Sequence, residues 1–178
     1  MKNKLMIYEI FSIIFTLFLG IILHFTYEIS NYNVIVSLFS SVNESTWEHL
    51  KILFFPMLIV TIVGSIYFKN IYYNYLCIKV RGILIALLFV IIFFYTYTGI
   101  IGTNYPILDI SSFVIAVIIS EVYTYINIIN KKNCNKLLSI IILILLTILF
   151  IVFTYYPPKI NLFKDPINNS YGVIKQDN

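Results

Sequence analysis

Apolar residues follow one another along this chain in long stretches, and five of these stretches are long enough to cross a membrane. They cover residues 5–26, 46–68, 83–101, 107–128 and 137–155. A helix needs about 20 apolar residues to cross a hydrocarbon layer of roughly 30 Å. The pattern therefore predicts an all-α integral membrane protein, a bundle of five transmembrane helices within a single domain over residues 1–178.

The composition of the chain also indicates a membrane location. Of its 178 residues, 60% are hydrophobic and 11% are charged, and the mean hydropathy is +0.92. A soluble domain carries about 25% charged residues, so this chain has too few to cover a globular surface in water. These numbers exclude a soluble enzyme, a nucleic-acid-binding protein and a disordered chain. We expect a multi-pass protein of the cell membrane whose partner is the lipid bilayer.

The basic residues predict the orientation of the helices. Lys and Arg occur before the first helix, between the second and third, and between the fourth and fifth, whereas residues 27–45 and 102–106 contain none. The residues concerned are Lys2, Lys4, Lys69, Lys79, Arg81, Lys131, Lys132 and Lys136. Because cytoplasmic loops carry an excess of Lys and Arg, we expect the N-terminus inside and the C-terminus outside. Residues 156–178 would then form an ordered extracytoplasmic tail.

Both cysteines of the chain fall in segments that this orientation assigns to the cytoplasm. They are Cys77 and Cys134. Structural disulfides are uncommon in that compartment because cellular reductants keep thiols reduced. The sequence therefore predicts two unpaired thiols.

Ionisable residues within a membrane protein are energetically costly, so the places where they gather are informative. Most of them are expected at the extracytoplasmic side, near the ends of the first four helices. The candidate cluster there consists of His24, Glu28, Glu44, Ser45, Glu48, His49 and Asp109. Glu9 and Glu121 lie in the inner half instead, and Glu121 lies about 120° around its helix from Asp109.

Three interpretations of this cluster remain open. Ser45 and Glu48 form the pattern of a capping box, so the polar residues could serve the fold alone. They could form a ligand or proton site, with Glu28, Glu44 and Ser45 as binding candidates. They could also form an enzyme site, because two imidazoles with carboxylates suit zinc or another divalent metal, and also suit acid–base chemistry. The metal candidates are His24, His49 and Asp109, and the catalytic candidates are His24, Glu48, His49 and Asp109.

A longer motif surrounds this cluster and carries a resemblance to a known family. It reads Asn43-Glu44-Ser45-Thr46-Trp47-Glu48-His49-Leu50-Lys51. Matching pieces precede it at residues 23–28 and follow it at residues 95–99 and 156–158. Over nearly its whole length the chain resembles a family of small polytopic bacterial membrane proteins that has only a domain-of-unknown-function label. The resemblance implies a shared fold and a membrane location, and it implies no reaction.

Two classes of function follow from the sequence. The first is a binding, transport or accessory membrane protein with an extracytoplasmic polar pocket. The second is a membrane-embedded hydrolase or transferase, metal-dependent or acid–base, that acts on a lipid head group. The most useful observation for distinguishing these classes would be a structure that shows whether His24, His49 and Asp109 converge.

Overall fold

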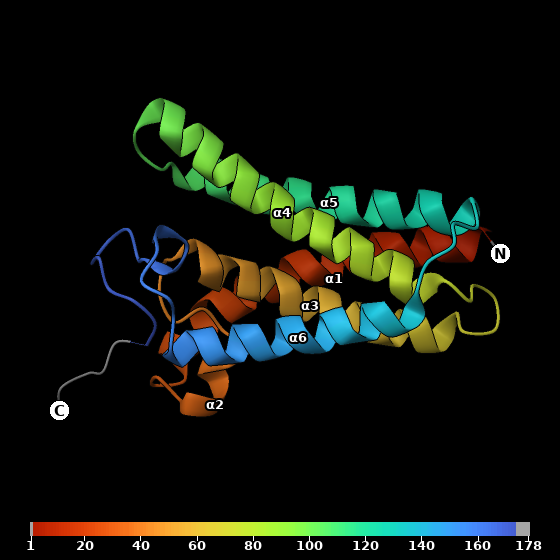
Figure 1. The fold of residues 1–178 in the computed structure, drawn as a ribbon, viewed down its shortest axis with the longest axis horizontal. Coiled ribbons are helices and arrows are strands. Elements are labelled where there is room, and N and C mark those ends of the chain that lie inside the picture. Colours follow the sequence, from red (N-terminus) through yellow and green to blue (C-terminus); the bar gives the residue numbers. More distant parts are fainter. Residues whose placement is uncertain (1, 174–178) are drawn as a thin grey trace.

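The computed structural model describes residues 2–173 and consists of helices joined by short connections (Figure 1). The helices are α1 (Lys2–Ile29), α2 (Val34–Ser37), α3 (Thr46–Tyr67), α4 (Tyr75–Ile101), α5 (Pro106–Ile129), α6 (Lys136–Tyr155) and the short 3₁₀ helix η1 (Asn161–Phe163). Five of them, all except α2 and η1, are long and apolar enough to cross a membrane. The prediction of an all-α protein with five potential membrane helices is confirmed.

The five long helices run roughly along one axis and alternate in direction (Figure 1). The start of α1 and the α3–α4 and α5–α6 connections lie at one end, which we call the basic end. The α1–α3 and α4–α5 connections and residues 156–173 lie at the other, which we call the tail end. Helix α3 packs against α1, α4 and α6, while α5 packs against α4 and α1. Every long helix therefore touches at least one of α3 and α4.

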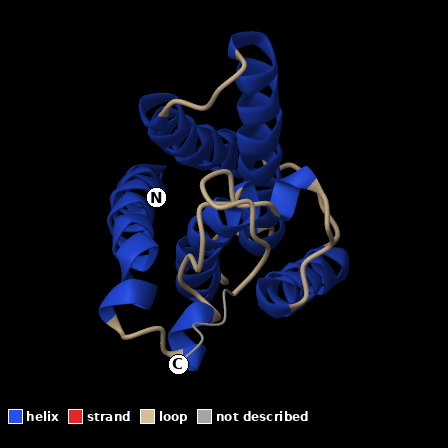
Figure 2. Cartoon of the chain, turned by 90° about the vertical axis from the view of Figure 1, so that its left-hand side faces the viewer, coloured by secondary structure: helices blue, strands red, loops and turns tan. Residues whose placement is uncertain are grey.

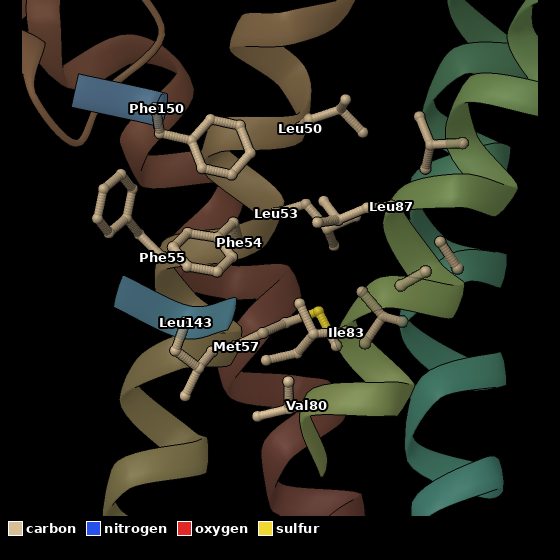
Figure 3. Close-up of a cluster of buried hydrophobic side chains, with 14 residues drawn as sticks. Leu50, Leu53, Phe54, Phe55, Met57, Val80, Ile83, Leu87, Leu143 and Phe150 are labelled. Atoms are coloured by element: carbon tan, nitrogen blue, oxygen red, sulfur yellow. The ribbon is translucent and has the colours of Figure 1, made fainter. Parts of the chain in front are cut away.

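The core lies where α3, α4 and α6 meet. Figure 3 shows Leu53 of α3 and Leu87 of α4 pointing toward one another, with Phe54 close to Phe150 of α6. The centroids of these two phenyl rings are 5.0 Å apart. Helices in a membrane gain little from the hydrophobic effect, since lipid is as apolar as their own side chains. Close packing of this kind therefore contributes to holding α3, α4 and α6 together.

Helix α4 begins at Tyr75, well before the span predicted from residue 83. Lys79 and Arg81, which the sequence analysis assigned to a cytoplasmic loop, therefore belong to the helix. Arg81 is exposed at the basic end, but Lys79 is completely buried. Hydropathy counts a lysine as an interruption of the apolar stretch. It cannot reveal that a neighbouring helix supplies the carboxylate that lets the lysine be buried.

The structure joins Cys77 and Cys134 as a disulfide, with their Cα atoms 6.1 Å apart, so the prediction of two unpaired thiols is wrong. Cys77 lies in the first turn of α4, and Cys134 lies just before α6. A hydrogen bond of 2.7 Å from the Asn74 side chain to the carbonyl of Lys132 joins the same two segments. The prediction considered the compartment alone, whereas the packing of α4 along α5 brings the two sulfur atoms together.

The tail folds back over the end of the bundle, where Figure 2 shows loops crossing between the helices. An isolated antiparallel bridge pairs Lys164 with Tyr171. Asp165, which is 3% exposed, accepts from the backbone N–H groups of Ile167 at 2.7 Å and Asn168 at 3.4 Å. This turn gives residues 161–173 a defined path over α3. Residues 174–178 of the expected ordered tail lie outside the described residues.

Candidate functional site

The start of α3 forms the framework of the candidate site. Ser45 caps this helix by accepting from the N–H of Glu48 at 3.4 Å, as the capping-box pattern predicts. The other half of the box differs, because the carboxylate of Glu48 accepts from the N–H of Val42 at 3.1 Å. The ammonium nitrogen of Lys51 lies 2.5 Å from Glu48 Oε2 and forms an ion pair with this carboxylate. Glu48 and Lys51 are both buried, so the pair belongs to the interior.

His24 of α1 and His49 of α3 approach each other at the tail end, with ring centroids 5.4 Å apart. The carboxylate of Glu44 lies between them. Its Oε1 is 3.7 Å from His24 Nε2, and its Oε2 is 3.5 Å from His49 Nε2. One potential ligand atom from each of the three residues lies within 4.8 Å of the other two. All three side chains are partly exposed, so a solute can reach them.

The orientation of the two imidazoles favours a bound cation. His49 Nδ1 lies 2.9 Å from the carbonyl oxygen of Ser45, to which it can donate. This tautomer leaves Nε2 with a lone pair directed at Glu44, as in most histidines that bind metals. His24 Nδ1 is shielded from solvent and has no hydrogen-bond partner among residues 2–173. Such an orphaned nitrogen indicates a site that a ligand or water completes.

The separations also suit a metal ion. Zinc binds imidazole nitrogen and carboxylate oxygen at about 2.0–2.2 Å, so neighbouring ligand atoms of a tetrahedral site are about 3.3–3.6 Å apart. The His24–Glu44 and His49–Glu44 separations of 3.7 and 3.5 Å lie close to that range. Two histidines and one glutamate would leave a fourth position open for water or a substrate.

A pocket of about 550 Å³ adjoins the three residues and is large enough for a small ligand. Its walls come from α1, α3, α4 and α5, and the tail contributes Pro166 and Ile167. The apolar lining residues are Gly20, Ile21, Phe25, Ile52, Val90, Phe94, Pro106, Ile110, Phe113, Pro166 and Ile167. The polar lining residues are His24, Glu44, Thr46, His49, Asn104, Asp109 and Ser112. The pocket therefore combines apolar walls with polar groups, which is the chemistry that an amphiphilic ligand requires.

Asp109 lines this pocket from the first turn of α5, outside the close group of His24, Glu44 and His49. Its Oδ1 accepts a short hydrogen bond from the hydroxyl of Tyr97 on α4. The oxygen of Tyr97 in turn accepts from the N–H of Tyr105 at 3.4 Å. These contacts fix the carboxylate at the pocket wall, outside the group formed by the two histidines and Glu44.

The structure brings together some of the candidate residues and separates others. His24, Glu44 and His49 converge, and Asp109 shares their pocket. Glu48 points away into its pair with Lys51, and Ser45 is used in capping α3. Glu28 is exposed on α1 and forms no ion pair within the described chain. The carboxylate next to His24 is therefore Glu44 from the following connection, and not Glu28 from the same helix.

The tail contributes to the site, as expected from its apolar residues, which need a partner surface at the pocket mouth, but its hydrogen bonds could not be predicted from sequence. The carboxylate of Asp165 accepts from the backbone N–H of Glu44 at 3.3 Å, and the side-chain amide of Asn43 donates to the carbonyl of Gly172 at 2.9 Å. These two contacts hold the connection that carries Glu44. The Asp165-Pro166 turn and its apolar flanks indicate a tail packed at the pocket mouth, but they do not specify the hydrogen bonds to Asn43 and Glu44.

Comparison with known proteins identifies the family of the chain. The model of a family of unknown function, DUF6512, matches residues 1–173, and the chain belongs to this family. The resemblance to a family without an assigned function is thereby confirmed at that level. No curated protein and no solved structure matches the chain.

Proposed function

We propose that this member of DUF6512 is a metal- and ligand-binding protein of the bacterial cell membrane. In this proposal His24, Glu44 and His49 hold one divalent transition metal ion, and zinc is the ion that suits them best. The observation that carries the proposal is the convergence of one ligand atom from each residue within 4.8 Å. Two neutral imidazoles and a carboxylate favour zinc over magnesium or calcium, which prefer oxygen ligands.

The orientation of the protein in the membrane is part of this proposal. The α1–α3 and α4–α5 connections carry no Lys or Arg, whereas Lys69, Lys131 and Lys132 lie in the connections at the basic end. The positive-inside rule then assigns the basic end to the cytoplasm. His24, Glu44, His49 and the pocket would face the outside of the cell.

Metal analysis of purified protein tests the metal site. Wild-type protein, freed of metal with a chelator, loaded with excess zinc and then dialysed against zinc-free buffer, should retain about one zinc per chain by mass spectrometry. Glu44→Gln and His49→Ala should lose it. Glu28→Gln is the matched control, because Glu28 is exposed on the same helix as His24 and outside the close group. Wild-type protein without zinc, or variants that keep it, would refute the site.

A membrane-embedded hydrolase acting on a lipid head group is the second candidate function, and the position of Asp109 supports it. A zinc-bound water needs a nearby base, and Asp109 is a carboxylate in the same pocket outside the metal group. Asp109→Asn should keep zinc but lose turnover of added phospholipids or lipid-linked sugars, measured by mass spectrometry of the lipid extract. Absence of turnover in zinc-loaded wild type across these lipid classes would leave the binding function alone.

A further inference from the structure

A second group of ionisable residues lies inside the bundle, between the basic end and the pocket. Lys79 of α4 donates to the carboxylate of Glu9 on α1 at 2.6 Å and to that of Glu121 on α5. All three side chains are buried, with exposed fractions of 4% or less for the residues. We call Glu9, Lys79 and Glu121 the buried triad. It joins three of the five long helices at one nitrogen atom.

The charges of the buried triad do not balance. Two ionised carboxylates and one ammonium group leave a net charge of −1 in the interior of the bundle, and an uncompensated charge there is strongly unfavourable. The other titratable groups next to it are the phenols of Tyr8 and Tyr75, which supply no positive charge. One bound proton would make the group neutral.

The hydrogen bonds of the buried triad are also incomplete. Oε1 of Glu9 and Oε1 of Glu121 are both buried and have no partner among residues 2–173. A carboxylate can only accept, so these two oxygens cannot satisfy each other while both groups are ionised. The Tyr75 hydroxyl is also buried without a partner in the described chain and can donate to Glu9, but it adds no positive charge and leaves Glu121 Oε1 without a donor. A proton bound between the two carboxylates supplies that donor. The net charge and the missing hydrogen bond are thus both accounted for by one bound proton.

A row of buried hydroxyl groups lies between the buried triad and the pocket. Ser12 and Thr16 follow Glu9 on α1 at spacings of three and four residues and lead to Gly20, which lines the pocket. Ser120 lies next to Glu121 on α5. The hydroxyls of Ser12, Thr16 and Ser120 are fully buried and lack a hydrogen-bond partner in the described part of the chain.

These hydroxyls differ from others in the bundle. Thr61, Thr124 and Thr147 each donate to the carbonyl four residues earlier in their own helix, at 2.6–2.8 Å. A Ser or Thr hydroxyl in a helix can form this bond, and its absence at three buried positions calls for another partner. Buried water molecules are the usual partners of such groups. The hydroxyls of Ser12, Thr16 and Ser120 therefore indicate a hydrated route through the bundle.

We propose that Glu9, Lys79 and Glu121 bind one exchangeable proton inside the bundle, and that Ser12, Thr16 and Ser120 connect this proton through buried water to the pocket. The proposal does not rest on the metal site, since none of these six residues belongs to it. It adds a proton-binding function to a protein whose pocket binds ligand at the tail end.

Infrared spectroscopy of the protein in lipid nanodiscs tests the proton site. Wild-type protein should show a protonated carboxyl band that disappears in Glu9→Gln and in Glu121→Gln, since the remaining carboxylate is then neutralised by Lys79. Lys79→Met should strengthen the band, because both carboxyls lose their cation. Glu28→Gln is the control and should leave it unchanged. A band that both glutamine variants retain, or none in wild type, would show that the buried triad is a fixed ion network.

Two further measurements use folded protein with the buried triad intact. Transfer to D₂O should shift the carboxyl band as its proton exchanges, and Thr16→Val should slow the shift several-fold. Thr147→Val is the control, because the Thr147 hydroxyl is already bonded to Leu143. Equal exchange rates would refute the hydrated route. Loss of the band when sodium chloride replaces choline chloride at constant pH would assign the site to sodium and refute the proton.

Discussion

The ammonium nitrogen of Lys51 and the Oε2 atom of Glu48 form an ion pair of 2.5 Å that is almost completely shielded from solvent. Lys51 also donates to the carbonyl of Ser37 at 2.8 Å and to the hydroxyl of Thr154 at 2.9 Å. One lysine thus links α3, the α1–α3 connection and α6. These contacts explain how the charged residues Glu48 and Lys51 can be buried at the start of an otherwise apolar helix.

Removing this lysine should strongly destabilise the protein. Lys51→Met leaves Glu48 buried without its cation, which typically costs about 3–5 kcal/mol. The double variant Lys51→Met/Glu48→Gln removes both charges and should recover part of that loss. Thermal unfolding of the detergent-solubilised protein measures both. A single variant as stable as wild type would contradict the importance of the pair.

Helices α4 and α5 should not tolerate a larger residue at Gly82. A Cβ atom there would lie 2.7 Å from Ser120 Oγ and 3.0 Å from the Ser120 carbonyl oxygen, and the backbone cannot move aside cheaply. We expect Gly82→Ala to lower the free energy of unfolding by about 1–3 kcal/mol. Gly99→Ala on the same helix is the control, because a Cβ there meets nothing within 4 Å. Equal melting temperatures for the two variants would contradict this packing.

The proposed orientation can be tested with single cysteines in a Cys77→Ser/Cys134→Ser background. Asn70 lies in the α3–α4 connection and Thr103 in the α4–α5 connection, and both are exposed. A membrane-impermeant thiol reagent should label Thr103→Cys in intact cells but label Asn70→Cys only after the cells are opened. The reverse pattern would assign the tail end to the cytoplasm.

The disulfide between Cys77 and Cys134 can be tested by counting the reactive thiols of the protein. Denatured protein should show no reactive thiol before reduction and two after it, counted by alkylation and mass spectrometry. The bond closes a loop between residues 57 apart, and its removal should cost about 2–4 kcal/mol. Two thiols that react without reductant would refute the bond. The disulfide lies at the end proposed to be cytoplasmic, so reductant should be left out during purification.

The tail should control metal binding without touching the metal. Asp165→Ala removes the acceptor for the Glu44 N–H and for two N–H groups of its own turn, so Glu44 loses its anchor. We expect zinc affinity to fall about 10- to 100-fold, as for other supporting residues of metal sites. Lys159→Ala, exposed in the same tail, is the control. Unchanged affinity in the Asp165 variant would show that Glu44 is held independently.

The helices of this protein are largely predictable from sequence, and its polar contacts are not. Long apolar stretches define five spans because crossing a membrane leaves few alternatives. Lys79 shows where this reasoning fails, since its burial depends on Glu9 and Glu121 from two other helices. Periodicity along one helix cannot reveal a partner on another.

The candidate site was predictable in its residue types and its end of the bundle, but not in its arrangement. His24 and His49 could be expected near one depth because both lie close to helix ends on the same side. Sequence spacing favoured Glu28 as the partner of His24, whereas the structure has Glu44 there. The tail fixes that position through Asp165, and no local pattern encodes a contact over 121 residues.

The hydrogen bond from Glu44 to Asp165 also determines when the site can be completed during synthesis. His24, Glu44 and His49 are synthesised early, but the residue that anchors Glu44 is made 121 residues later. At about 5–20 residues per second, the ribosome needs on the order of 10 s to reach it. Until then, the nascent chain carries His24, Glu44 and His49 without the contact that holds the Glu44 backbone. The candidate site is thus completed by a residue that is made long after its own side chains.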